Sequence, residues 1–210
     1  MEKYKQMIAN NINLKMKKMK SIITLIILVI SITSCKAQHI IPVEQGYQYV
    51  ASEEGFIGNY DYVYVKDINN ILPKFIGTWK GVLNNKTYVF KVEKTTIDDG
   101  ELKEDILLLR YKITNNSNNS IVENTLTLPN DSPYVMKNGY VAETGSYVFS
   151  YIGKDVACGQ NGWVFMRILN NTNNLNAKLF LQVEGETYPE CTTGAAQQVL
   201  PTNWIDLIKQ

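Results

Sequence analysis

Apolar and polar residues alternate with a period of two along most of the chain after residue 77. The clearest example is 86–94, where Tyr88, Phe90 and Val92 fall on one face and charged residues on the other. Successive side chains of a strand point to opposite faces of its sheet. This alternation therefore predicts a half-buried β-strand.

Similar short runs follow one another along the chain, separated by polar turns. The pair Asn84-Asn85 is typical of a two-residue hairpin turn, and longer polar turns separate later runs. Regularly spaced short strands indicate an all-β fold, a barrel or a sandwich, and closure into a barrel would protect the edges of the sheet. We expect an antiparallel meander of about eight strands that closes into a barrel. The expected strands are 78–83, 86–94, 105–113, 121–128, 146–152, 163–169, 177–183 and 204–208.

Three other segments lack this alternation. Residues 67–76 begin with Asp67, a candidate helix cap, and contain Pro73, which predicts a short helical turn before the first barrel strand. Residues 129–143 contain two prolines and are predicted to form a longer loop. Residues 36–59 are predicted to be a tether, so that the folded domain covers 60–210.

The amino-terminal segment has the features of a secretion signal. Lysines precede an apolar run at 22–30, and the segment from Ser21 to Cys35 is only 15 residues long. A helix of that length spans roughly 22 Å, too short for a bilayer core of about 30 Å. We therefore expect residues 1–35 to be a cleaved signal peptide. Residues 1–15 exceed a normal signal, which leaves open Met16 or Met19 as the true initiator.

The segment Ile32-Thr33-Ser34-Cys35 resembles a bacterial lipobox. The resemblance implies that Cys35 is acylated and becomes the first residue of the mature protein. Acyl chains would give the protein a stable membrane anchor. Because Lys36 follows without an acidic run, we expect a lipoprotein of the outer membrane that faces the periplasm.

The charge balance argues against nucleic-acid binding. Residues 1–34 contain six lysines and one acid, so totals of 21 basic and 20 acidic residues become 15 and 19 in the mature part. A mildly acidic domain without a cluster of Lys or Arg lacks the electrostatic surface of a nucleic-acid-binding protein.

The two remaining cysteines, Cys158 and Cys191, are expected to form a disulfide. The chain has three cysteines, and lipidation of Cys35 leaves a pair in an oxidising compartment. Both lie in sequences typical of loops. The alternative is two independent buried thiols.

Residues 75–79, Phe-Ile-Gly-Thr-Trp, followed by a hairpin, resemble the first strand of lipocalin-like (calycin) barrels with their Gly-x-Trp signature. The resemblance implies that Trp79 closes the base of the barrel and is stacked by a basic side chain from near the carboxyl end. Lys209 or Arg167 would be that partner. Other lipocalin motifs are absent.

Three segments are similar to a family of uncharacterised flavobacterial (Bacteroidota) lipoproteins, a domain of unknown function. They are Lys66-Asp67 before 75–80, residues 105–112, and the terminal 200–210. This resemblance implies a fold and a location in the cell envelope but no activity.

Candidate catalytic and metal-binding residues are few. The only histidine, His39, lies in the predicted tether, so we expect neither a His-based catalytic site nor a His metal site in the domain. The strongest candidate for carboxylate chemistry is an acidic cluster whose spacing does not match an EF-hand. A solvated hairpin turn explains it more simply, and we expect no cofactor. The cluster contains Asp98, Asp99, Glu101, Glu104 and Asp105.

Tyrosines and phenylalanines alternate at Tyr60, Tyr62 and Tyr64 and again at residues 147–151. They are expected either to pack the core or to line a cavity. Two functions follow, neither of them enzymatic. The first is a barrel that binds a small apolar or amphipathic ligand. The second is a filled barrel that presents loops such as 129–143 to another envelope protein.

Overall fold

The computed structural model describes residues 16, 19–20, 39–50 and 62–210. The chain divides into two compact units, Met1–Gln38 and His39–Gln210. The predicted signal, except for Met16, Met19 and Lys20, and the predicted lipidation site Cys35 lie outside the described residues.

The second unit is mostly β-structure, as predicted, with one short helical turn directly before β3. That turn is η2 (Leu72–Lys74), and Asp67 caps it by accepting hydrogen bonds from the backbone N–H groups of Ile71 and Leu72, at 2.7 and 3.3 Å. Two further short helical segments, η1 (Val43–Gln45) and α2 (Tyr47–Val50), follow the first strand. The strands are β1 (His39–Pro42), β2 (Val63–Lys66), β3 (Gly77–Leu83), β4 (Lys86–Asp98), β5 (Leu102–Asn115), β6 (Ile121–Asn124), β7 (Lys137–Val141), β8 (Tyr147–Ile152), β9 (Asn161–Ile168), β10 (Asn176–Val183) and β11 (Ile205–Lys209).

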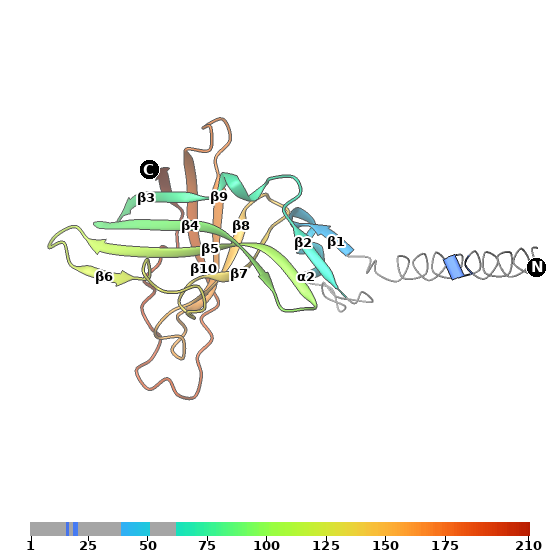
Figure 1. Cartoon of the computed structure of the whole chain (residues 1–210). Coiled ribbons are helices and arrows are strands. Elements are labelled where there is room, and N and C mark those ends of the chain that lie inside the picture. Colours follow the sequence, from blue (N-terminus) through green and yellow to red (C-terminus); the bar gives the residue numbers. More distant parts are fainter. Residues whose placement is uncertain (1–15, 17–18, 21–38, 51–61) are drawn as a thin grey trace, which may run out of the picture. The chain divides into compact units, whose positions relative to one another are not determined.

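The strands form one sheet in the order β1-β2-β5-β4-β3-β11-β10-β9-β8-β7, and β6 pairs separately with β5. The predicted hairpin between β3 and β4 is present. Both of its turn residues have positive φ, 48° at Asn84 and 59° at Asn85, which is the backbone of a type I′ turn. Figure 1 shows that β3, β4 and β5 cross the direction of β8, β9 and β10, so the sheet bends over its own core.

The prediction of a closed barrel of eight strands is wrong. The sheet has eleven strands, and it is mixed because β1, β2 and β5 pair in parallel. Its two sides approach each other at a single described pair, Leu109 and Met136, through backbone bonds of 3.0 and 3.1 Å. The free edge of β5 is shared by β2, Met136 and β6 in turn, and β7 therefore forms no ladder with it.

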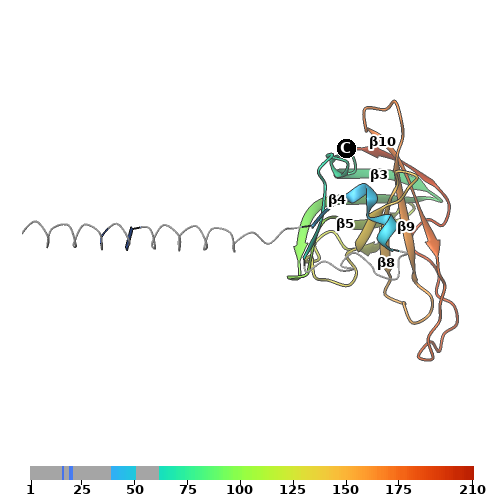
Figure 2. The same cartoon turned by 90° about the vertical axis from the view of Figure 1, so that its right-hand side faces the viewer.

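Part of the predicted tether belongs to the fold. Residues 39–50 form β1, η1 and α2, and Ile41 and Val43 are only 2% and 4% exposed. These elements lie at the same end of the sheet as β2 (Figures 1 and 2). The alternation of this segment covers only a few residues, which is too short to predict a strand without knowing its partner β2.

The predicted loop 129–143 is also partly ordered into the fold. It contains β7, and Val135 is buried with Ile106 and Leu108 of β5. Arg110 fastens the start of the loop by donating from Nε to the backbone oxygen of Leu128 at 2.9 Å. The outer face of β5 is apolar and needs this cover, so β5 is buried on both faces.

Candidate functional site

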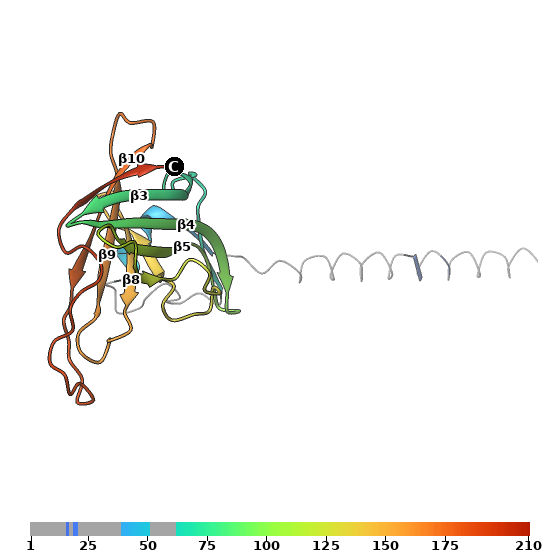
Figure 3. The same ribbon diagram turned by 90° about the vertical axis from the view of Figure 1, so that its left-hand side faces the viewer.

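A cavity of about 370 Å³ lies at the end of the sheet where β3 turns into β4. We call it the hairpin-end cavity. One wall comes from the hairpin and the other from the segment that leads into β11, which lie beside each other in Figure 3. The residues that line it are Leu83, Asn84, Lys86, Tyr88 and 197–203.

Hydrogen bonds hold the second wall in place. The side-chain amide nitrogens of Gln160 and Gln198 donate to the backbone oxygens of Gln197 and Gly159, each at 2.8 Å. The backbone N–H of Leu181 donates to Pro201 at 2.7 Å. The wall is thus tied to the chain around residue 160 and to strand β10.

The chemistry of the cavity is polar, with one cation. Lys86 is half-buried, and within the described residues no acidic side chain pairs with it. Tyr88 is 5% exposed and stacks on Phe90, and its phenol has no hydrogen-bond partner in the described part of the chain. Burial raises the pKa of Tyr88, so its hydroxyl stays protonated and can donate. Neither a carboxylate nor a histidine or cysteine lines the cavity.

The interior of the sheet is filled by aromatic rings. Trp79, Phe90, Tyr111, Phe149 and Tyr151 are each at most 1% exposed. The set at 147–151 therefore packs the core. Of the earlier set, Tyr60 lies outside the described residues, whereas Tyr62 and Tyr64 are half-buried and donate to carboxylates on β4 and β5.

Trp79 lies next to the carboxyl end, and Lys209 is the basic side chain beside it. The ammonium of Lys209 is 5.1 Å from the centre of the Trp79 ring, and Trp79 Nε1 donates to the Phe75 oxygen at 2.8 Å. Arg167 instead lies on β9 opposite Lys178. A Cβ at Gly77 would be 2.6 Å from Cε of Lys209, so the glycine of the Gly-x-Trp segment leaves room for the lysine stem.

The acidic cluster divides into two parts. Asp98 and Asp99 belong to the exposed turn between β4 and β5, where hydrogen bonds, chiefly from Tyr62 and from the Leu102 N–H respectively, lower their pKa values. Asp105 instead lies in a buried ion cluster with Asp67 and Lys94. Within the described residues, no group of three or more His, Cys, Asp or Glu side chains is placed to hold a metal ion.

Lys94 bridges the two buried carboxylates of this ion cluster. Its Nζ is 3.2 Å from Asp105 Oδ2 and 3.4 Å from Asp67 Oδ2. Burial alone would lower the pKa of Lys94, but the two carboxylates raise it above its ordinary value. Burial likewise acts to raise the pKa of Asp105, but hydrogen bonds led by the Asp67 N–H hold it below its ordinary value.

The lowered pKa of Asp105 predicts a loss of stability in acid. A carboxyl whose folded pKa is depressed stabilises the fold fully above its unfolded pKa, about 3.9, and loses this contribution as pH falls through the folded value. We expect the difference in unfolding free energy between wild type and Asp105→Asn to be constant from pH 7 to 5 and to shrink below pH about 4. Urea unfolding at several pH values measures it. An equal difference at pH 3 and pH 7 would contradict the assignment.

Residues 19–195, most of the chain, match a family of unknown function, DUF6705. The chain belongs to this family. The matched range includes Cys35, Trp79 and both other cysteines, and it ends before the second wall of the hairpin-end cavity. No curated protein and no solved structure matches the chain.

Cys158 and Cys191, both within the DUF6705 range, form a disulfide in the structure, as expected from the sequence. Their sulfurs are 2.07 Å apart and their Cα atoms 4.9 Å apart. His39 lies on β1 and takes no part in the cavity. In the part of the DUF6705 chain that the structure describes, none of the helices has the length and apolar character needed to cross a bilayer.

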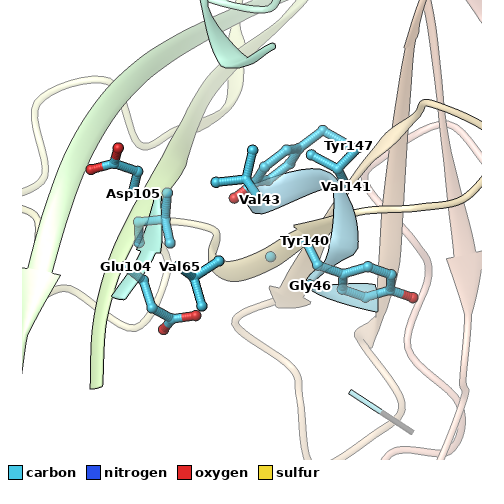
Figure 4. A pocket seen from close by; sticks show the side chains of 10 residues that line it. Val43, Gly46, Val65, Glu104, Asp105, Tyr140, Val141 and Tyr147 are labelled. Carbon is cyan, nitrogen blue, oxygen red and sulfur yellow. The ribbon is translucent and has the colours of Figure 1, made fainter. Parts of the chain in front are cut away.

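A second, much smaller cavity in this DUF6705 protein lies between η1, β5 and β7 (Figure 4). Its volume is about 20 Å³, room for roughly one water molecule. Glu104 and Asp105 border it with their carboxylates turned apart. Burial, with a smaller effect of Asp99, raises the pKa of Glu104. The space is too small for an organic ligand.

The sequence did not single out the residues of the hairpin-end cavity. Lys86 was part of a predicted strand, Gln197-Gln198 carried no motif, and Thr202-Asn203 entered only through the family resemblance of residues 200–210. The polar stretch before the last strand was the available signal. Its position opposite the β3–β4 turn depends on long-range strand order, which no local pattern contains.

Proposed function

We propose that this protein is a lipid-anchored binding protein of the bacterial cell envelope that takes a small hydrophilic ligand in the hairpin-end cavity. The anchor and location rest on the signal and lipobox at Cys35. The observation that carries the binding function is the cavity itself, about 370 Å³ beside an interior already filled by aromatic rings. A preformed hollow with a few polar groups is the usual form of a small-molecule site.

Binding fits the cavity better than catalysis does. General acid–base chemistry needs paired titratable groups within reach of a substrate, and the lining offers only one lysine and one buried phenol. A hydrophilic ligand fits better than an apolar one, because the amides of Asn84, Gln197 and Asn203 line the cavity and can pair with polar groups of a ligand.

The proposal is tested by filling the cavity. Thr202→Trp adds a large side chain at an exposed position of the lining, and Thr127→Trp is the matched control at an exposed threonine outside it. Saturation-transfer NMR of the full chain in detergent, with a pool of sugars, organic acids and amino acids, should give signals that Thr202→Trp removes and Thr127→Trp keeps. The absence of any Thr202-dependent signal would overturn the proposal.

One observation favours the second function, an interaction module with a filled interior. Phe165 of β9, Phe180 of β10 and Trp204, directly before β11, form an aromatic row with ring centres 5.1 and 4.3 Å apart. Trp204 is 44% exposed. Exposed aromatic side chains are common at protein interfaces.

A further inference from the structure

We infer that the ligand of the hairpin-end cavity is a hydroxyl-rich molecule with a single carboxylate, the size of one sugar ring, such as a uronic acid. The inference rests on the proposed binding function and specifies its ligand class. It follows from the charge of the lining, its hydrogen-bonding groups and its volume.

The charge of the lining favours one negative group. Lys86 is the single charged side chain among the lining residues, and no described acid neutralises it. A cation at the edge of a partly enclosed site attracts an anion more strongly than it would on an open surface. A ligand with several negative charges would leave all but one of them unpaired.

The remaining polar groups favour hydroxyls. The amides of Asn84, Gln197, Gln198 and Asn203 both donate and accept, and so does the hydroxyl of Thr202. Hydroxyl groups match this mixture because each can donate and accept in turn. An aliphatic acid would satisfy Lys86 but would offer the amides no hydrogen-bonding group.

Tyr88 provides a further, directed donor. Its ring is held against Phe90, and its hydroxyl is the part without a partner in the described chain. Because the side chain is 5% exposed and lines the cavity, the hydroxyl is available to a ligand and to little else. A ring or carboxylate oxygen of the ligand would accept from it.

The volume is sufficient for one sugar ring. About 370 Å³ corresponds to roughly a dozen water molecules at about 30 Å³ each. A single hexuronate, whose bonded atoms pack more closely than separate water molecules, fits in this space with room for water beside it.

The experiment compares four probes on the full-length protein in detergent at low salt: glucuronate, glucose, propionate and glucose 6-phosphate. Isothermal titration should give a Kd for glucuronate about fivefold or more below those of glucose and propionate, because about 1 kcal/mol from the ion pair or from the hydroxyl contacts equals a fivefold change. The preference over glucose should weaken as salt is added.

Variants separate the contribution of the ion pair from that of the hydroxyl contacts. Lys86→Met should bring glucuronate down to the affinity of glucose while glucose binding stays, and Lys80→Met, an exposed lysine on β3 outside the lining, should change neither. Tyr88→Phe keeps the ring stacked on Phe90 and should weaken both sugars by a similar factor. Circular dichroism of each variant checks that it folds.

The outcomes distinguish this inference from the binding function. Equal affinity for glucose and glucuronate, abolished by Thr202→Trp, would overturn the acidic ligand and leave the binding site. Tighter binding of glucose 6-phosphate would replace the carboxylate by a phosphate and also overturn the inference. If no probe binds while the wider pool gives Thr202-dependent signals, the ligand class is wrong. If neither gives a signal, both are overturned.

Discussion

Replacing Lys94 by methionine should lower the free energy of unfolding by about 2–4 kcal/mol, because it removes the cation that lies between two buried carboxylates. The side chains of Asp67 and Asp105 are 0% and 7% exposed. Removing one partner of a buried ion pair typically costs about 3–5 kcal/mol. The Lys94 side chain is 32% exposed, so water can enter after its removal, and the expected loss is therefore somewhat smaller than this range.

A matched variant on the same strand distinguishes this effect from a general loss of charge. Lys91 pairs with Glu93 at 2.8 Å, but both side chains are more than 40% exposed, so Lys91→Met should change stability by at most about 0.5 kcal/mol. Urea unfolding of the three proteins at pH 7 provides the comparison. If Lys94→Met were as mild as Lys91→Met, the two carboxylates would have to be hydrated in the folded protein.

The sequence predicted turns and short helical segments correctly where the interaction that forms them involves neighbouring residues. Asn84-Asn85 predicted the β3–β4 turn, and both residues have the positive φ that such a turn needs. Asp67 was recognised as a cap and accepts from the N–H groups of Ile71 and Leu72. In each case the deciding interaction lies within a few residues of its signal.

The ion cluster shows what the sequence could not predict. Asp105 was grouped with the acids of a solvated turn, because Asp98 and Asp99 are close in sequence and do lie in that turn. Its burial depends on η2 and on Lys94 of β4, which reach it only through the pairing of β5 with its neighbours. The same reason hid β1, which pairs in parallel with β2 across the intervening η1 and α2.

Pairing between strands that are distant in sequence also explains why a closed barrel was predicted but does not form. The alternation of each strand predicts a sheet with one buried face, but it does not specify what pairs with the last free edge. In this protein β2, Met136 and β6 divide the edge of β5 among them. Strand β2, which carries β1 of the predicted tether on its other side, thereby occupies part of the edge that barrel closure would have needed.

Replacing both Cys158 and Cys191 by serine should lower the free energy of unfolding by about 3–4 kcal/mol. The two residues are 33 apart in sequence, and a cross-link over a loop of that length restricts the unfolded chain by about this amount. Urea unfolding with and without reductant measures the loss. Reductant should destabilise the wild type to the level of the double variant and leave the double variant unchanged.

The same replacement should weaken ligand binding at the hairpin-end cavity. The chain beside Cys158 supports the second wall, because the Cys158 oxygen accepts from the Ala196 N–H and the Gly159 oxygen accepts from Gln198, both at 2.8 Å. Without the disulfide, residues 184–195 are held to this chain only by hydrogen bonds such as that from the Tyr188 N–H to the Ala157 oxygen at 2.8 Å. The second wall is then less firmly placed, so Kd for the bound probe should rise several-fold at a temperature where the variant remains folded. An unchanged Kd together with the full loss of stability would show that the hydrogen bonds around residue 160 position the wall without the disulfide.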